Sequence, residues 1–314
     1  MLRSERAVEL HESESPHGIG WRIQRLDVHM RDRTDNPGLI MDILADILRR
    51  LSNLRVLTFA ITGHGYDAFD FLPHNVLQAT NACRDTLRLL NWYGGVRPPS
   101  NTWASFLENH PRLEAINAPV VLTQLGNSHI VLDSLKSIYI NCLQDMIWNI
   151  NLPSIRHAIY DVPSTGSLSH EFLPGIASKL TSIQINIPRN NSPVFEPLLR
   201  ILAICKNLTR VDLVTSGWFI VQSLFQSSVV ETVHTLGIRV NHDAHQIDRF
   251  SLRAFFGGII LVLCHFPSVK TFCFTDRRNI QALRVHSQAF SSNLADLLIL
   301  GVDVMDHEGR PLVV

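Results

Sequence analysis

Fifteen histidines make metal binding the first chemistry to consider in this sequence of 314 residues. His242 and His245 are three residues apart, so on a helix both imidazoles would lie on one side and could share a metal ion. No further ligand stands at a recognisable spacing, and the segment is polar and follows a predicted strand. We expect a solvated loop here, and we predict no metal site and no cofactor.

The sequence also lacks the motifs that are typical of nucleophilic catalysis and of nucleotide binding. No Gly-x-Ser-x-Gly nucleophile turn and no Walker-type phosphate loop occurs. The cysteines include no Cys-x-x-Cys pair and predict reduced thiols, at Cys83, Cys142, Cys205, Cys264 and Cys273. Cys205 and Cys264 lie on apolar predicted helices, where a small buried hydrophobic residue is the ordinary role. The sequence therefore predicts no catalytic residues and no enzyme, and the alternative is an enzyme on a compact α/β fold.

Charge and hydrophobicity narrow the classes of partner. The 28 basic and 28 acidic side chains cancel, so no net field attracts nucleic acid or an acidic membrane surface. The longest apolar run, over residues 254–264, is shorter than the roughly 20 residues that cross a bilayer. No signal-peptide pattern opens the sequence. These features predict a cytoplasmic or nuclear protein that binds neither nucleic acid nor membrane.

A short hydrophobic unit recurs along the chain and predicts the elements that hold the polar side chains. In its clearest copy, the anchor Leu54 is followed by Leu57 and Phe59, three and five positions later. The same pattern starts at ten further anchors with a mean spacing of about 27 residues, namely Ile23, Leu87, Leu113, Leu135, Ile155, Leu180, Leu208, Val233, Val269 and Leu294. A spacing of about 20 to 29 residues is typical of leucine-rich repeats.

Segments with a helical period lie between these units. Asn36 before Pro37 is a typical helix start, Ser192-Pro193 repeats the signal, and Ser100 opens a third such segment. Alternating strands and helices predict an α/β leucine-rich-repeat solenoid of about 10–11 irregular repeats, with a parallel sheet on its concave face and helices on its convex face. The alternative, a doubly wound α/β domain, would carry a glycine-rich turn after its first strand, and this sequence has none.

The repeats predict a single domain over residues 21–314, preceded by a polar and disordered tail over residues 1–20. Because side chains alternate along a strand, the third residue after each anchor should face the core. We expect these residues to stack from repeat to repeat in one buried row, which includes Leu57, Ile138, Ile183, Val211, Leu236 and Phe272.

The second, fourth and sixth residues after each anchor should lie on the opposite face of the sheet. In the central repeats these residues carry hydrogen-bonding groups, one aromatic ring and separated charges, a mixture that favours a protein or peptide partner over nucleic acid. The predicted partner-binding residues are Tyr139, Asn141, His157, Asp161, Gln184, Asn186, Arg210, Asp212 and Arg239. Tyr139, Arg210 and Arg239 are the expected anchors, since tyrosine and arginine are enriched at binding hot spots. The alternative is that these residues form only the solvated face of a sheet.

Three phrases of the sequence resemble the irregular leucine-rich repeats of fungal F-box proteins: residues 51–57, Trp103 to Glu114, and Leu152-Pro153-Ser154-Ile155. The resemblance covers roughly residues 21 to 300. It implies a ubiquitin-ligase substrate receptor, in which an N-terminal F-box docks on a Skp–cullin ligase and the repeats recruit a substrate. Residues 1–20 are too few for a three-helix F-box, and the ladder asparagine of regular repeats is replaced, for example by Leu143. Binding to the ligase adaptor is therefore implied only if an F-box lies upstream, and the alternative is a scaffold without one.

Overall fold

The computed structural model describes residues 20–30, 36–61, 72–94, 96, 100–117, 130–141, 150–161, 176–187, 202–218, 229–241, 249–286, 288 and 290–312. Contacts within the chain divide it into two compact units. The first comprises Met1–Tyr139 and Asp145–Ile155, and the second comprises Ile140–Gln144 and Arg156–Val314. The single domain expected over residues 21–314 stays a prediction, and residues 1–19 of the expected tail lie outside the described part.

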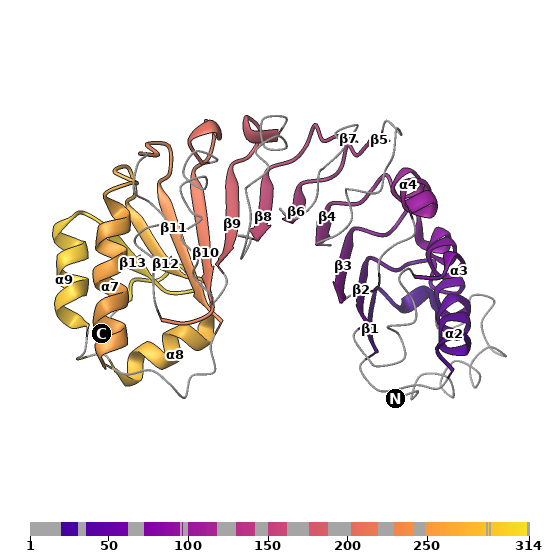
Figure 1. Cartoon of the computed structure of the whole chain (residues 1–314), viewed down its shortest axis with the longest axis horizontal. Helices are drawn as coiled ribbons and strands as arrows, with labels where there is room; N and C mark the ends of the chain where they lie inside the picture. The colour runs from indigo at the N-terminus through magenta and orange to yellow at the C-terminus, as the bar shows by residue number, and fades with distance from the viewer. Residues whose placement is uncertain are drawn as a thin grey trace. The chain divides into compact units, whose positions relative to one another are not determined.

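Among the described residues, eleven strands lie side by side in one sheet in the order in which they occur along the chain (Figure 1). Each neighbouring pair with a defined register is parallel. The strands are β1 (Arg25–Met30), β2 (Val56–Ile61), β3 (Leu89–Gly94), β4 (Ala115–Asn117), β6 (Ser137–Asn141), β8 (His157–Asp161), β9 (Ser182–Ile187), β10 (Arg210–Thr215), β11 (Thr235–Val240), β12 (Thr271–Phe274) and β13 (Asp303–Met305). The short strands β5 (Ile130–Val131) and β7 (Ile150–Asn151) pair separately.

The repeated unit has a defined backbone role. In ten of the eleven predicted units the strand begins two residues after the anchor. The anchor closes a turn: the N–H of Leu54 donates to the carbonyl of Leu51 at 3.4 Å. The next two N–H groups, of Arg55 and Val56, both donate to the carbonyl of Gln24 in the preceding repeat, at 2.8 and 2.9 Å. The anchor spacing therefore sets both the turn and the register of the following strand.

The eleventh anchor, Leu294, was wrongly predicted. Leu294 lies in the helix α9 (Ser291–Ile299), and the last strand, β13, begins nine residues later at Asp303. Gly301, with φ at +75°, turns the chain between the helix and this strand, a conformation that glycine adopts without strain. Leu294 and Leu297 are both buried on one side of the helix. A three-residue step fits a helix face as well as the repeat, and this explains the error.

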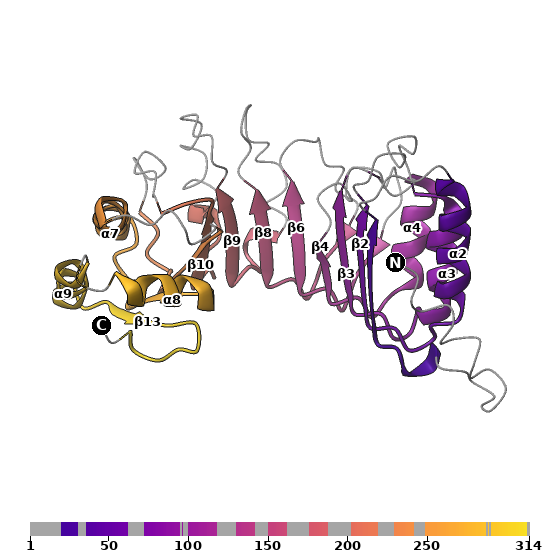
Figure 2. The same ribbon diagram turned by 90° about the horizontal axis from the view of Figure 1, so that it is seen from below.

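Helices cover one face of the sheet in each unit. In the first unit α2 (Pro37–Arg49), α3 (His74–Ala79) and α4 (Ser100–Asn109) lie together on one side of the strands (Figure 2). The predicted start of α2 is confirmed, because the Asn36 side chain accepts a hydrogen bond from the N–H of Leu39 at 3.2 Å. In the second unit α7 (Arg249–Leu263) and α9 pack beside β11–β13, and α8 (Arg277–Val285) follows β12. The helix expected after Ser192-Pro193 lies largely outside the described residues.

The predicted core row is confirmed: Leu57, Ile138, Ile183, Val211, Leu236 and Phe272 are each at most 1% exposed. In the second unit Ile183, Val211, Leu236 and Phe272 are direct partners on adjacent strands. Aromatic rings from the helices complete this layer. Trp103 of α4 meets Trp92 of β3 with ring centroids 6.1 Å apart, and Phe256 of α7 meets Phe274 of β12 at 6.2 Å. The helix side of the sheet is therefore the core, and functional groups must be sought on its other side.

Candidate functional site

The second unit exposes one continuous face of its sheet away from the helices. We call it the open face and define it by the residues that alternate with the core along β8–β12: His157, Ile159, Asp161, Ser182, Gln184, Asn186, Arg210, Asp212, Val214, Thr235, Gly237, Arg239, Thr271 and Cys273. Parallel pairing aligns Gln184, Asp212, Gly237 and Cys273 in one row across four strands. Seven of the nine predicted partner-binding residues belong to this face.

The two remaining predicted residues lie on β6. Tyr139 is half-buried and belongs to the first unit. The side chain of Asn141 lies outside the described residues. The structure therefore brings together His157, Asp161, Gln184, Asn186, Arg210, Asp212 and Arg239 on one unit, and Tyr139 is placed separately.

A bidentate ion pair lies at the centre of the open face. The Nε of Arg210 donates to both carboxylate oxygens of Asp212 at 3.1 and 2.9 Å, and its Nη2 donates to Oδ1 at 2.9 Å. The hydrogen bonds that Arg210 donates to Asp212 raise the pKa of Arg210 above its ordinary value. The same Nη2 reaches the sulfur of Cys273, two strands away, at 3.8 Å. The Arg210 side chain thus lies flat across β11, with its charge neutralised by Asp212.

Gly237 provides the space for this pair. A Cβ atom on Gly237 would lie 1.8 Å from Oδ1 of Asp212 and 3.1 Å from Cγ2 of Thr275. No real side chain can adopt the first of these distances, so Asp212 can hold its position only because β11 carries a glycine opposite it. Glycine is required at this position for space and not for its backbone freedom, because the φ angle of Gly237 lies outside the left-handed region.

An amide chain adjoins the ion pair. The Nε2 of Gln184 donates to Oδ1 of Asn186 at 2.9 Å, and the Nδ2 of Asn186 donates to Oδ1 of Asp161 at 2.6 Å. Burial raises the pKa of Asp161, which the hydrogen bond from Asn186 partly offsets. His157 contacts Oγ of Ser182 at 2.8 Å, and burial lowers its pKa, so that its imidazole is neutral at pH 7. These side chains hold one another in fixed orientations while remaining partly exposed.

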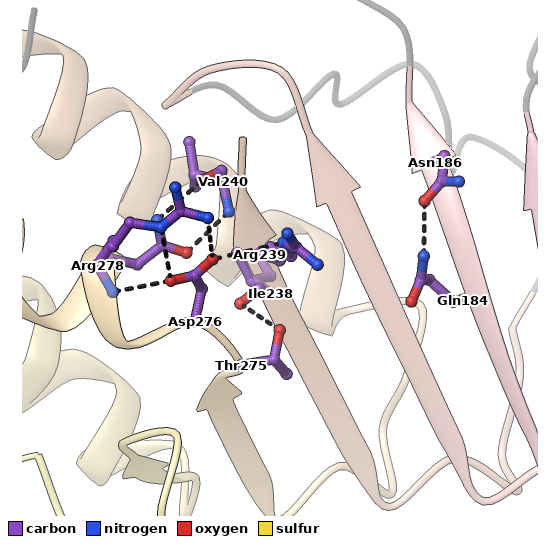
Figure 3. A network of polar contacts seen from close by, with 9 residues as sticks. Gln184, Asn186, Ile238, Arg239, Val240, Thr275, Asp276 and Arg278 are labelled. Atoms are coloured by element: carbon purple, nitrogen blue, oxygen red, sulfur yellow. Dashed lines mark hydrogen bonds and ion pairs between the residues drawn. The ribbon is translucent and has the colours of Figure 1, made fainter. Parts of the chain in front are cut away.

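A second polar cluster lies where β11 and β12 end (Figure 3). Asp276 caps α8, because its Oδ1 accepts from the N–H of Arg278 at 2.8 Å. The other carboxylate oxygen, Oδ2, lies 3.5 Å from the Nε of Arg239 and 3.3 Å from Nη2 of Arg278. Two guanidinium groups from different elements therefore converge on one carboxylate.

The first unit carries a polar ladder on the corresponding face of its sheet. Nδ2 of Asn117 donates to Oδ1 of Asn91 at 2.8 Å, and Nδ2 of Asn91 donates to Oγ1 of Thr58 at 3.2 Å. Thr58 in turn donates to Asp27, whose pKa is lowered first by the hydrogen bond from Arg25 and then by that from Thr58. Tyr93 is the exposed aromatic residue of this face, at 50%. The ladder links four strands, and its groups mainly satisfy one another.

Three of the cysteines in the described ranges are not poised as nucleophiles. Burial raises the pKa of Cys83 and of Cys205 to about 11, and it also raises the pKa of Cys273. The expected burial of Cys264 was wrong, because this residue is exposed at the end of α7. That helix is apolar on both sides, with Leu261 half exposed, so hydrophobicity alone could not identify its buried face. Cys142 and the pair His242 and His245 lie outside the described residues.

Several residues of the site were missed from the sequence. Tyr93, Thr58 and Asn91 follow from the same alternation when it is applied to the first repeats, which the prediction left out. Gly237 occupies a predicted open-face position, but a glycine carries no side chain and was passed over. Asp276 and Arg278 lie beyond their strand, and no periodic signal marks them.

Comparison with solved structures identifies a protein of similar fold. The chain is similar to LegL7, a leucine-rich-repeat-containing protein from Legionella pneumophila, with a TM-score of 0.50 and 12% identity over 92% of each chain. No protein-family model and no curated protein sequence matches the chain. None of the helices in the described ranges is long and apolar enough to cross a membrane. The parallel sheet, its helices and this likeness establish a leucine-rich-repeat fold.

Proposed function

We propose that the protein is a recognition module that binds a protein or peptide partner through the open face. The observation that carries this proposal is the hydrogen-bonded order of that face. Arg210, Asp212, Gln184, Asn186 and Asp161 are each held by a neighbour before any partner arrives. Side chains that are already ordered lose less conformational entropy on binding.

The balance of charge on the open face supports a protein partner. Two of its arginines, Arg210 and Arg239, lie beside carboxylates. A surface that binds nucleic acid through phosphates needs an excess of positive charge along a stripe. Paired charges interspersed with amides suit the mixed polar surface of a protein better.

The residues predicted from the sequence as partner contacts are proposed here in the same roles, and the contact made by Arg210 is specified further. Arg239 and Tyr139 are proposed as anchors, and Asn141, His157, Asp161, Gln184, Asn186 and Asp212 as hydrogen-bonding contacts. Arg210 is also proposed as an anchor, although its charge is engaged by Asp212. Its exposed guanidinium edge would then contact the partner by packing and by its remaining N–H groups.

A finer proposal follows from the resemblance to fungal F-box proteins. The repeats would recruit a substrate for ubiquitination, and the Skp–cullin adaptor would bind only through an F-box encoded upstream. The alternative proposal is an F-box-free scaffold that holds its partner without ubiquitin chemistry. Co-purification of the longest natural gene product with the ligase adaptor separates the two: the receptor requires it, and the scaffold does not.

The proposed anchors, Arg210 of the open face and Tyr139 of the first unit, are tested by comparing two matched double variants in an unbiased pull-down. Tyr139→Ala with Arg210→Ala should reduce recovery of the specific partner and, once the partner is purified, weaken its affinity by at least about 2 kcal/mol, as hot-spot residues do. The control, Phe250→Ala with Arg284→Ala, likewise removes one aromatic residue and one arginine, from exposed positions on α7 and α8. Equal loss in both variants, or loss only in the control, would contradict the proposal.

A further inference from the structure

The start of α8 is fixed rigidly to the ends of two strands. Asn279 is buried, and its side chain makes two hydrogen bonds of 2.9 Å with the N–H and the carbonyl of Val240. Thr275 adds a backbone hydrogen bond of 2.8 Å to the carbonyl of Ile238. Arg278 and Asp276 therefore project from a frame that is locked to β11, the strand that carries Arg239 (Figure 3).

The three charged residues of this cluster differ in how far they reach solvent. The side chain of Asp276 is only 14% exposed, whereas those of Arg239 and Arg278 are 45% and 77% exposed. Asp276 thus lies beneath two guanidinium groups and orients them both. Within the described residues, neither arginine makes an ion pair with any other acid. Their outward N–H groups remain available to a ligand.

Positive charge is in excess around this pair. The helix α8 contains Arg277, Arg278 and Arg284 and no acidic residue. Burial alone would raise the pKa of Asp276, but the hydrogen bonds from Arg278 and the charges of both arginines bring it below its usual value, so this carboxylate stays ionised at pH 7. Even so, Asp276 and α8 together hold one carboxylate and three arginines, and Arg239 adds a fourth arginine beside Asp276. The amide at the helix start is already occupied by Asp276, so the surplus comes from the arginine side chains.

The Arg210–Asp212 pair provides a contrast on the same face. One arginine meets one carboxylate in bidentate geometry there, and no surplus charge is left. Charge is therefore uneven over the open face and the adjoining start of α8: the centre is neutral, Asp161 is acidic, and Arg239 and Arg278 are basic. A partner that lies across it finds an attraction for acidic groups only at the end near α8.

We propose that a linear acidic segment of the partner protein binds at this end, with an aspartate or glutamate side chain bridging the guanidinium groups of Arg239 and Arg278. This inference rests on the proposed function and adds the chemistry of the partner. The bridging carboxylate would accept charge-assisted hydrogen bonds from both arginines, in the orientation that Asp276 already imposes. Preorganisation of the two donors by the buried frame lowers the entropy lost on binding.

A displayed library of random 12-residue peptides tests the proposal without knowledge of the natural partner. Peptides selected on the wild-type protein should be enriched in aspartate and glutamate, and their binding should weaken with salt. Arg239→Gln with Arg278→Gln should abolish the enrichment and weaken the selected acidic peptides by at least about tenfold. Arg284→Gln removes a positive charge from the same helix but leaves Arg239 and Arg278 in place. This variant should keep both the acidic enrichment and the affinity for the selected peptides. Thermal unfolding of each variant checks that the fold is retained.

A double-mutant cycle makes the assignment specific. Changing the acidic residue of a selected peptide to its amide should weaken binding to the wild type, with little further effect on the double variant. Wild-type selections without acidic enrichment, or enrichment that survives in the double variant, would overturn the inference. If such peptides still depend on Tyr139 and Arg210, the proposed function stands and only the acidic partner is wrong. Peptides insensitive both to the Tyr139 and Arg210 variant and to the Arg239 and Arg278 variant would overturn both proposals.

Discussion

Replacing Gly237 by alanine should disrupt the centre of the open face. The new Cβ would lie 1.8 Å from Oδ1 and 2.9 Å from Cγ of Asp212, so the carboxylate must rotate away from Arg210. Forcing a methyl group into filled space costs about 1–3 kcal/mol. Loss of the ion pair adds at most about 1 kcal/mol, because Arg210 is 42% exposed and solvent screens its charge. Alanine is favoured over glycine within a strand by about 0.5–1 kcal/mol, so the three contributions together give a net loss centred on about 2 kcal/mol.

A second background tests the cause of that loss. In Asp212→Ala the obstructing carboxylate is absent, so adding Gly237→Ala should cost little or should stabilise the protein by about 0.5 kcal/mol. Urea unfolding of the four proteins of this cycle gives the coupling free energy directly. If Gly237→Ala costs the same with and without Asp212, the steric reasoning is wrong.

Three further predictions concern the core, a helix cap and a buried carboxyl. Leu57→Ala should cost about 2–5 kcal/mol in urea unfolding, since Leu57 is fully buried, and wild-type stability would place the core row on the wrong face. Asn36→Ala should lower the free energy of unfolding by about 1 kcal/mol, because α2 loses its N-cap, whereas Asn36→Ser should retain most of the stability that the cap provides. Thermal melting of the two variants distinguishes these outcomes. Asp161→Asn keeps an oxygen that can accept the hydrogen bond from Asn186, but it removes a carboxyl group whose pKa is raised by burial. Because the folded protein holds this proton more tightly than the unfolded chain, the free energy of unfolding of the wild type should fall as pH rises from about 4 through the raised pKa. The variant should show a smaller fall over the same pH range. Parallel pH profiles of stability would contradict this assignment.

Local regularity explains why so much of the fold was predictable. The anchor leucine closes a turn, and the two N–H groups after it bond to the previous repeat, so a pattern such as Leu54 to Phe59 encodes turn, strand and register together. The alternation of faces follows from strand geometry, and it placed Gln184 and Arg210 on the side away from the core. The pattern failed at Leu294, where one spacing fits both a strand unit and a helix face.

The contacts within the site depend on relations that no local pattern contains. Gly237 matters because Asp212 lies beside it on a strand 25 residues earlier in the chain. Arg239 and Arg278 meet because Asn279 fastens the start of α8 to Val240. Such pairs require the register of neighbouring strands and the placement of a helix end, which a single sequence does not reveal.

Site-specific photo-cross-linking tests the central claim, recognition through the open face, most directly. A benzophenone amino acid placed at Gln184 reports contacts of the open face, and one placed at Ala295, exposed on α9, reports the helix side. The account predicts a discrete cross-linked protein from position 184 that disappears when Tyr139 and Arg210 are both alanine, and no such product from position 295. A discrete product from position 295 alone, with none from position 184, would contradict it.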